Sequence, residues 1–212
     1  MVISYSFVND YTNCPRKAYH KYVIRDMPKE DSTALRHGNV VHRLLEDAIN
    51  DKKPIPSEYP YERFIRALQG LHAPLKAEVK VAATSDGVAC DYYAKEVAFR
   101  GKVDVLVSTA NEAVLVDWKT GKVREDPLEL EIQASLVGIN LPSVGKLSGY
   151  YVWLAEGKVG RKHSFDSPKK TFDGLTKIRE EAMNRTEWEP KPNPLCGYCP
   201  LRTCEFNRRK PK

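Results

Sequence analysis

The segment from Arg100 to Lys122 reads Arg-Gly-Lys-Val-Asp-Val-Leu-Val, then a short polar connection, then Ala-Val-Leu-Val-Asp-Trp-Lys-Thr-Gly. Two β-branched apolar runs flank the polar residues 108–112, so the segment predicts two antiparallel strands joined as a hairpin. Each run carries one carboxylate, Asp104 in the first and Asp117 in the second. Lys119 follows Asp117 by two residues, and such side chains share a face of a regular strand. Charged groups on a buried hairpin need a partner or a metal ion.

The length and composition indicate one compact domain spanning residues 1–212. The chain has 212 residues, of which 42% are hydrophobic, enough for a core. No apolar run approaches the roughly 20 residues of a membrane span. The N-terminus also lacks the basic start and apolar stretch of a secretory signal. We therefore expect a cytoplasmic protein without a membrane partner. Its formal net charge of +6 favours a polyanionic partner, although ordinary surfaces also carry such an excess.

Hydrophobic periodicity predicts an α/β fold. Apolar residues at helical spacing predict helices over 5–23, 34–50, 61–72, 126–140 and from 167 onward. Alternating segments predict strands at 78–81, 96–99, 149–155 and 159–165, in addition to the hairpin. This order suits a mixed central sheet with helices on its faces.

The two aspartates and the lysine form a candidate catalytic group. Asp104 and Asp117 on neighbouring strands could converge on a divalent cation, because hard oxygen ligands suit Mg²⁺ or Mn²⁺. Lys119 could orient or help deprotonate the water that attacks a phosphodiester. His42, on the flank of a predicted amphipathic helix, could add a nitrogen ligand. The alternative for His42 is a half-buried helix residue bonded to Glu46.

Four of the five cysteines lie near the two ends of the chain, at Cys14, Cys196, Cys199 and Cys204. The two-residue spacing of Cys196 and Cys199 lets both thiolates reach one metal from a tight turn. In a reducing compartment clustered cysteines more often hold metal than form disulfides. The spacing leaves zinc and an iron–sulfur cluster both open. Cys90 stands alone and is expected to be a small, partly buried structural residue.

The hairpin, together with Gly38-Asn-Val-Val-His42 upstream, resembles the PD-(D/E)XK nucleases, specifically their RecB-like exonuclease branch. The resemblance implies a restriction-endonuclease-like fold. It also implies Mn²⁺ or Mg²⁺ ligation by His42, Asp104, Asp117 and the backbone carbonyl of Trp118, with Asp104, Asp117 and Lys119 as the catalytic residues. Glu78 is a further acidic candidate. Gln133 matches a glutamine near the DNA, although the family's tyrosine four residues later is Val137 here.

The cysteine pattern is similar to that of the iron–sulfur RecB-like nucleases, which include CRISPR-associated members and AddB-type nuclease domains. The resemblance implies that Cys14, Cys196, Cys199 and Cys204 hold a [4Fe–4S] cluster. Residues 1–30 and 190–212 would then form an iron–sulfur subregion, in which the cluster staples the helical N-terminus to the C-terminal segment.

Together these patterns predict a metal-dependent DNA exonuclease that hydrolyses phosphodiester bonds at single-stranded or frayed ends. Its context would be DNA recombination, repair, or CRISPR or phage DNA processing, with DNA and other DNA-processing proteins as partners. A DNA-binding or assembly module with little intrinsic cutting is the first alternative. A zinc-stapled RNA-binding domain is the second.

Overall fold

The computed structural model describes residues 1–28 and 31–208. Residues 29–30 and 209–212 of the two predicted iron–sulfur ranges lie outside the described residues. The helices and strands are, in chain order, α1 (Tyr5–Asn13), α2 (Pro15–Ala18), α3 (Thr33–Asn50), α4 (Glu62–Gln69), β1 (Leu75–Ala83), β2 (Phe99–Ser108), β3 (Glu112–Lys119), α5 (Pro127–Asn140), β4 (Lys146–Trp153), β5 (Lys158–Val159), β6 (His163–Ser164) and α6 (Pro168–Asn184). A π-helical turn at Tyr19–Val23 follows α2, and a 3₁₀ turn at Pro194–Tyr198 precedes the last cysteines.

The strands form one mixed sheet in the order β1-β2-β3-β4-β5, with β6 also paired to β4. Strands β1, β2 and β3 are antiparallel neighbours, whereas β3 and β4 are parallel. Parallel neighbours need a crossover connection, which α5 supplies here. The predicted hairpin and the predicted mixed sheet flanked by helices are confirmed.

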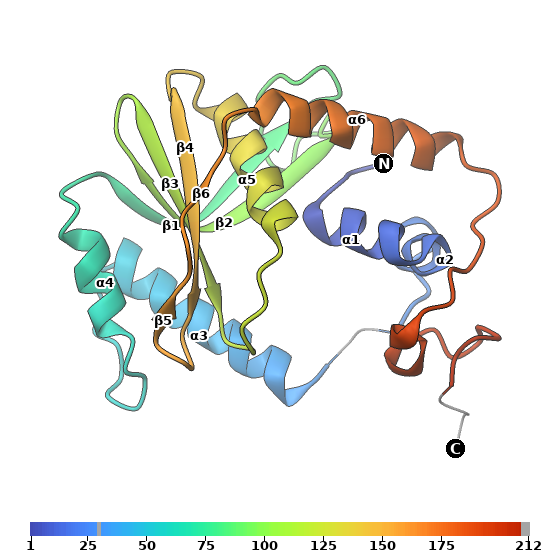
Figure 1. Cartoon of the computed structure of the whole chain (residues 1–212), viewed down its shortest axis with the longest axis horizontal. Coiled ribbons are helices and arrows are strands. Elements are labelled where there is room, and N and C mark those ends of the chain that lie inside the picture. Colours follow the sequence, from blue (N-terminus) through green and yellow to red (C-terminus); the bar gives the residue numbers. More distant parts are fainter. Residues whose placement is uncertain (29–30, 209–212) are drawn as a thin grey trace.

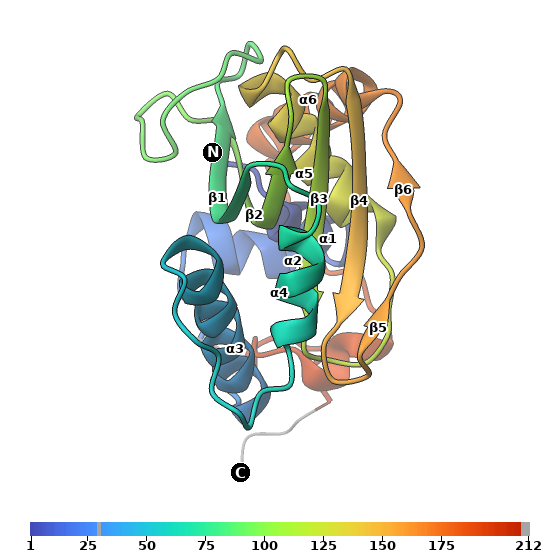
Figure 2. The ribbon, with the colours of Figure 1, turned by 90° about the vertical axis from the view of Figure 1, so that its left-hand side faces the viewer.

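Helices cover both faces of the sheet (Figures 1 and 2). Helices α3 and α4 contribute to one apolar cluster with β2, β3 and β4. Helices α1, α5 and α6 contribute to a second cluster on the opposite face. The sheet is therefore buried on both sides, which is typical of a three-layer α/β arrangement.

Helix α5 begins immediately after the loop that leaves β3, and its start is fixed by several contacts. The Asp126 side chain caps the helix by accepting from the Leu128 N–H, and Pro127 occupies the first turn. The hydroxyl of Tyr151 donates to the Asp126 carbonyl at 2.6 Å, and that of Tyr5 donates to the Asp126 carboxylate at 2.7 Å. These contacts tie the first turn of α5 to both α1 and β4.

Two predicted strands differ from the structure. The expected strand at 96–99 is wrong, because β2 begins only at Phe99 and residues 84–98 form a loop. The apolar alternation of 96–99 serves the core instead, where Ala98 and Phe99 are buried. The expected strand at 159–165 is split into β5 and β6, both paired with β4. The chain leaves the sheet after Gly160, whose N–H still donates to the Tyr151 carbonyl and which packs against the Trp153 ring.

Among the described residues, none of the helices combines the length and apolar content needed to cross a membrane.

Helix α5 offers a test of the core. Leu136 is fully buried, whereas Leu128 on the same helix is 39% exposed. Leu136→Ala should therefore lower the free energy of unfolding by about 2–5 kcal/mol through lost burial and a residual cavity. Leu128→Ala should lower it by less than about 1 kcal/mol. Urea unfolding followed by circular dichroism measures both, and equal losses would contradict this packing of α5.

Candidate functional site

Strands β2 and β3 part at the two aspartates. They pair over Val105–Ser108 and Ala113–Val116, so Asp104 and Asp117 are the first residues beyond the paired segment. The backbone N–H of Trp118 donates instead to the Asp104 side chain, with 2.9 Å between the nitrogen and Oδ2. A buried amide needs an acceptor, and here the carboxylate replaces a backbone carbonyl. The parting of the strands therefore opens the sheet where the acids lie.

Beside Asp104, the side chains of the edge strand β1 switch from one face of the sheet to the other. Ala77 and Val105 pack in the cluster with α3 and α4, whereas Val79 and Val103 pack in the cluster with α1 and α5. Residues two apart in a regular strand would share one face, so both strands rotate here. Glu78 takes up the change with φ of +57°, a conformation that is unfavourable for residues other than glycine.

This rotation brings Glu78 and Asp104 beside His42 of α3. The Nδ1 atom of His42 lies 3.4 Å from Asp104 Oδ1 and 3.7 Å from Glu78 Oε1. Ligand atoms of the three residues all lie within 4.8 Å of one another. Burial disfavours the charged imidazole, but the two carboxylates outweigh it and raise the pKa of His42 to about 10. The predicted ligands His42 and Asp104 and the additional candidate Glu78 are thus brought together.

One nitrogen and two carboxylate ligands fit a hard divalent cation such as Mg²⁺ or Mn²⁺. Burial opposes the charged form of Glu78, but His42 and Lys102 outweigh that effect and hold its pKa below its usual range. Lys102 also forms an ion pair with Glu78. The grouping therefore contains two carboxylates in a partly buried place, where a divalent cation would be stabilised.

A second group of charges lies on β3 and α5. Lys119 Nζ is 2.7 Å from Asp117 Oδ2 and 2.8 Å from Glu129 Oε2. Asp117 is only 3% exposed, and burial, reinforced by the Asp104 charge, raises its pKa to about 7. Burial opposes the ammonium of Lys119, but Asp117 and Glu129 outweigh it and raise the lysine pKa. Asp117 and Lys119 share a face of β3, as predicted.

The two groups meet at Asp117 and Gln133. Gln133 Nε2 lies 3.4 Å from the Lys102 carbonyl and 3.5 Å from Asp117 Oδ1. Among the described residues, Gln133 Oε1 and Asp117 Oδ2 are buried without a hydrogen bond, although Lys119 makes ion-pair contact with the latter. Asp117 lies outside the 4.8 Å grouping formed by His42, Glu78 and Asp104. Trp118 contributes its backbone N–H, and its ring packs against Phe64 of α4.

A cleft of about 860 Å³ opens over these residues. Its walls are α3 and the connection from β3 to α5, which approach closely at Gly38. A Cβ atom at that position would lie 3.3 Å from the Thr120 hydroxyl. A larger cavity of about 1120 Å³ lies between α5, α6 and the tip of the β2–β3 hairpin, and none of the predicted site residues lines it.

Sequence reasoning missed Glu129 and Lys102. Glu129 stands three residues after the helix cap Asp126 and ten after Lys119, so its place in the first turn of the helix that follows β3 was the available signal. Lys102 precedes Asp104 by two residues and could have been placed on the same face of the hairpin.

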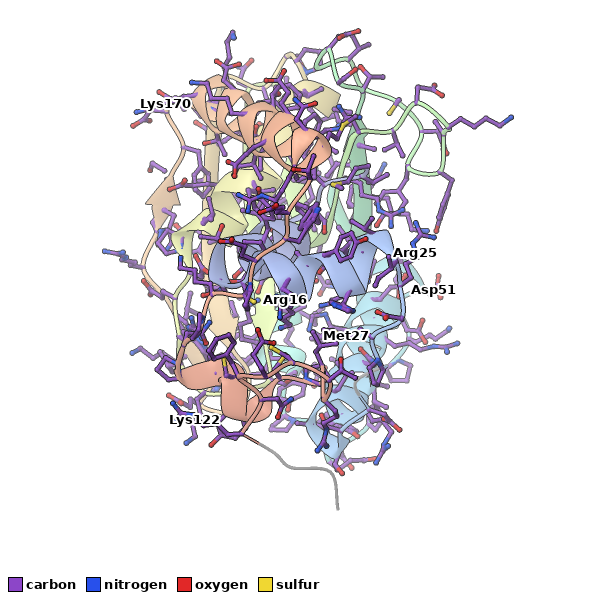
Figure 3. All side chains as sticks on the ribbon, turned by 90° about the vertical axis from the view of Figure 1, so that its right-hand side faces the viewer. Arg16, Arg25, Met27, Asp51, Lys122 and Lys170 are labelled. Atoms are coloured by element: carbon purple, nitrogen blue, oxygen red, sulfur yellow. The ribbon has the colours of Figure 1, made fainter. Side chains whose placement is uncertain are left out.

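The cysteines near the two chain ends lie in one region, where the C-terminal segment returns to α1 and α2 (Figure 1). The Lys191 N–H donates to Cys14 Sγ, and the Asn193 N–H donates to Cys196 Sγ. Burial raises the pKa of Cys199, and the neighbouring Cys14 and Cys204 raise it further. Arg16, labelled in Figure 3, pairs with Glu205 across the two segments. Cys90 is half-buried in the loop between β1 and β2.

Comparison with known proteins agrees with a nuclease fold of this kind. The model of the PD-(D/E)XK nuclease superfamily matches residues 2–204, and the chain belongs to that superfamily. No curated protein matches its sequence.

Two solved structures show a similar fold. The crystal structure of SSO0001 matches with a TM-score of 0.55 and 15% identity, covering 98% of this chain and 87% of that one. A protein of Eubacterium rectale named "Putative exonuclease" matches with a TM-score of 0.52 and 14% identity, covering 100% and 90%.

The three-residue grouping leads to a direct test of metal binding. Asp104→Asn removes one negative charge and should weaken Mn²⁺ binding by more than about 10-fold, the loss that even supporting residues of metal sites cause. Asp173→Asn, at an exposed position on α6, should leave the affinity unchanged. Isothermal titration calorimetry measures both, and equal Mn²⁺ affinities of the two variants would refute this site.

Proposed function

We propose that this chain is a RecB-like, divalent-metal-dependent deoxyribonuclease that acts as an exonuclease on single-stranded or frayed DNA ends. The observation that carries the proposal is the convergence of Asp104, Asp117 and Lys119 in one cleft where the sheet opens. Membership of the PD-(D/E)XK superfamily supports nuclease chemistry, and the name of the Eubacterium rectale protein supports the exonuclease mode. We further propose that residues 1–212 act as one cytoplasmic domain in DNA recombination, repair, or CRISPR or phage DNA processing.

His42, Glu78 and Asp104 would hold the metal ion, and Asp117 and the Trp118 carbonyl would be its further ligands. When bound, Mg²⁺ or Mn²⁺ would polarise the scissile phosphate and lower the pKa of a water molecule.

Lys119 would act as a charged hydrogen-bond donor. Asp117 and Glu129 hold its ammonium from two sides and raise its pKa, so the side chain remains protonated. A fixed ammonium can orient the attacking water and stabilise the negative charge that develops on the phosphate. Gln133 would hold Asp117 in position from α5 through its side-chain amide.

Removal of the lysine tests the chemistry. Lys119→Ala should reduce metal-dependent release of nucleotides from end-labelled linear DNA by about 10²–10⁴-fold, because a positioned charge and hydrogen-bond donor are lost. DNA binding and the circular dichroism spectrum should be retained. Lys177→Ala, which removes an exposed lysine on α6, should cut at the normal rate.

The substrate form separates the modes of action. Linear DNA should be degraded from its ends while circular DNA survives. Cleavage of the circle would contradict the exonuclease mode, and undiminished cutting by Lys119→Ala would contradict the site. Binding without any metal-dependent turnover of the unmodified protein would instead indicate a DNA-binding or assembly module.

We also propose that Cys14, Cys196, Cys199 and Cys204 hold a [4Fe–4S] cluster that joins the two ends of the chain. Backbone N–H groups already point at Cys14 and Cys196, and such hydrogen bonds to sulfur stabilise cluster thiolates. Burial raises the pKa of Cys199, and Lys17 nearby offsets part of that rise. Contacts of Lys191 with the Thr12 carbonyl and of Asn193 with the Asn13 carbonyl hold the segments together beside these sulfurs.

The cysteine site has its own test. Protein purified without oxygen should be brown, with broad absorbance at about 400 nm and bound iron. Cys199→Ala should lose the colour and lower the melting temperature, since the cross-link between distant segments is lost. Cys90→Ala should keep the colour. Colourless protein containing one zinc ion would favour the zinc alternative at the same residues.

A further inference from the structure

An exposed patch of tyrosines and cations lies beyond the cleft, at the edge strand of the sheet. We define the tyrosine patch as Lys80, Tyr92, Tyr93 and Arg100. Lys80 Nζ lies 5.0 Å from the ring centre of Tyr93, and Arg100 Cζ lies 5.2 Å from that of Tyr92. Tyr93 is 70% exposed. Its ring contacts the ring of Tyr92 edge-on, with 5.1 Å between the ring centres, and it is not among the residues of the apolar core clusters.

The loop that carries the tyrosines is ordered by its own hydrogen bonds. The Tyr93 N–H donates to Asp91 Oδ1 at 2.8 Å, and the Ala94 N–H donates to the Asp91 carbonyl at 3.1 Å. The Ala98 N–H closes the loop onto the Ala83 carbonyl. Figure 2 shows this loop projecting beside β1, away from α3 and α4. The rings are therefore presented on a fixed support, so that a ligand need not order them.

The cations of the patch are available to a ligand. Among residues 1–28 and 31–208, no carboxylate forms an ion pair with Lys80 or Arg100. The aromatic rings are the partners of both cations, and a ring does not neutralise their charge. This distinguishes them from Lys102, which is paired with Glu78 inside the cleft.

The patch is continuous with the candidate active site. Lys80 of β1 lies directly opposite Lys102 of β2, and Ala82 lies opposite Arg100. Residues two apart share a face, so Lys102 and Arg100 point the same way along β2. Asp104 to Arg100 covers four residues, or roughly 13 Å along a strand. Lys80 and Arg100 thus lie next to Lys102, which lines the cleft, so the patch adjoins the cleft along β1 and β2.

We propose that the tyrosine patch binds single-stranded DNA, with Lys80 and Arg100 contacting phosphates and Tyr93 stacking on a base as the strand passes into the cleft. This inference rests on the proposed function, since it names where the nuclease holds its substrate. Alternating aromatic rings and cations are the arrangement by which proteins bind single strands without sequence preference. In a duplex the bases are stacked on one another and their faces are not accessible to a ring, so the exposed tyrosine favours a single strand.

The experiment measures binding without cleavage. Fluorescence anisotropy of fluorescein-labelled oligo(dT) is recorded in EDTA with the full chain, its Tyr93→Ala and Tyr93→Phe variants, and the matched lysine variants Lys80→Ala and Lys177→Ala. Tyr93→Ala should weaken binding by about 5-fold or more, the effect of losing one base–aromatic stack. Tyr93→Phe keeps the ring and should bind normally.

The contribution of charge to binding is measured separately, from the dependence of affinity on salt. Lys80→Ala should reduce the slope of log affinity against log salt by about 0.7, because one phosphate contact to a single strand is lost. Lys177→Ala, on α6, should leave both affinity and slope unchanged. A blunt duplex of matched sequence should bind more weakly than oligo(dT). The affinity for this duplex should be the same for Tyr93→Ala as for the unmodified chain.

Two results would overturn the proposal: oligo(dT) affinity that is the same for Tyr93→Ala as for the unmodified chain, or equal sensitivity of the duplex to that substitution. Tighter binding of oligo(U) with the same dependence on Tyr93 would reassign the patch to RNA. Because the binding experiment requires no cleavage, failure of the tyrosine-patch proposal can be distinguished from failure of the nuclease proposal. A chain that never hydrolyses DNA can still show Tyr93-dependent binding, and a chain that hydrolyses DNA without it contradicts the patch alone.

Discussion

The hydrogen bond from the Trp118 N–H to the Asp104 carboxylate is the interaction on which the site depends. Where β2 and β3 stop pairing, the buried amide of Trp118 would otherwise lose its acceptor and Asp104 Oδ2 would lose its donor. Either loss would cost roughly 1–3 kcal/mol, and here each group satisfies the other. The bond fixes the point at which the strands separate. It thereby fixes the position of Asp117, which lies between Trp118 and the paired segment of β3. Asp117 therefore stands where the two strands begin to separate.

The same opening explains the strained backbone of β1. If β1 remained regular, Ala77 and Val79 would face the same side, yet they pack in clusters on opposite faces of the sheet. The positive φ of Glu78 permits the change, at a cost of order 1–3 kcal/mol. Its carboxylate then lies between His42 and Lys102, which stabilise the charge. The site thus costs free energy in backbone strain and in crowded negative charge, and a bound cation would offset the second of these costs.

These features mark the boundary of what sequence can predict. Local periodicity was sufficient for the hairpin, the mixed sheet and most helices, and a two-residue spacing was sufficient to place Asp117 and Lys119 on one face. That reasoning assumes regular strands, so it could not foresee that β1 and β2 rotate at Glu78 and Asp104. It also misassigned 96–99, because alternating apolar residues pack equally well at the end of a loop as in a strand. Sequence reasoning missed Glu129 for another reason, because its contact with Lys119 depends on how α5 packs in the folded chain.

The cations of the edge strand have two independent physical reasons to be where they are. An edge strand presents unpaired backbone groups, and lysines there discourage pairing with another chain. Lys76 and Lys80 of β1 meet that need. Protection of an edge, however, requires charge alone and gives no reason for rings beside the charge. Tyr92 and Tyr93 are held against Lys80 and Arg100 by a loop that hydrogen-bonds to itself, at a position where they shield little of the core. Protection of the edge therefore does not explain the combination of rings with cations that form no ion pair among the described residues, and the proposed binding of a single strand would explain it.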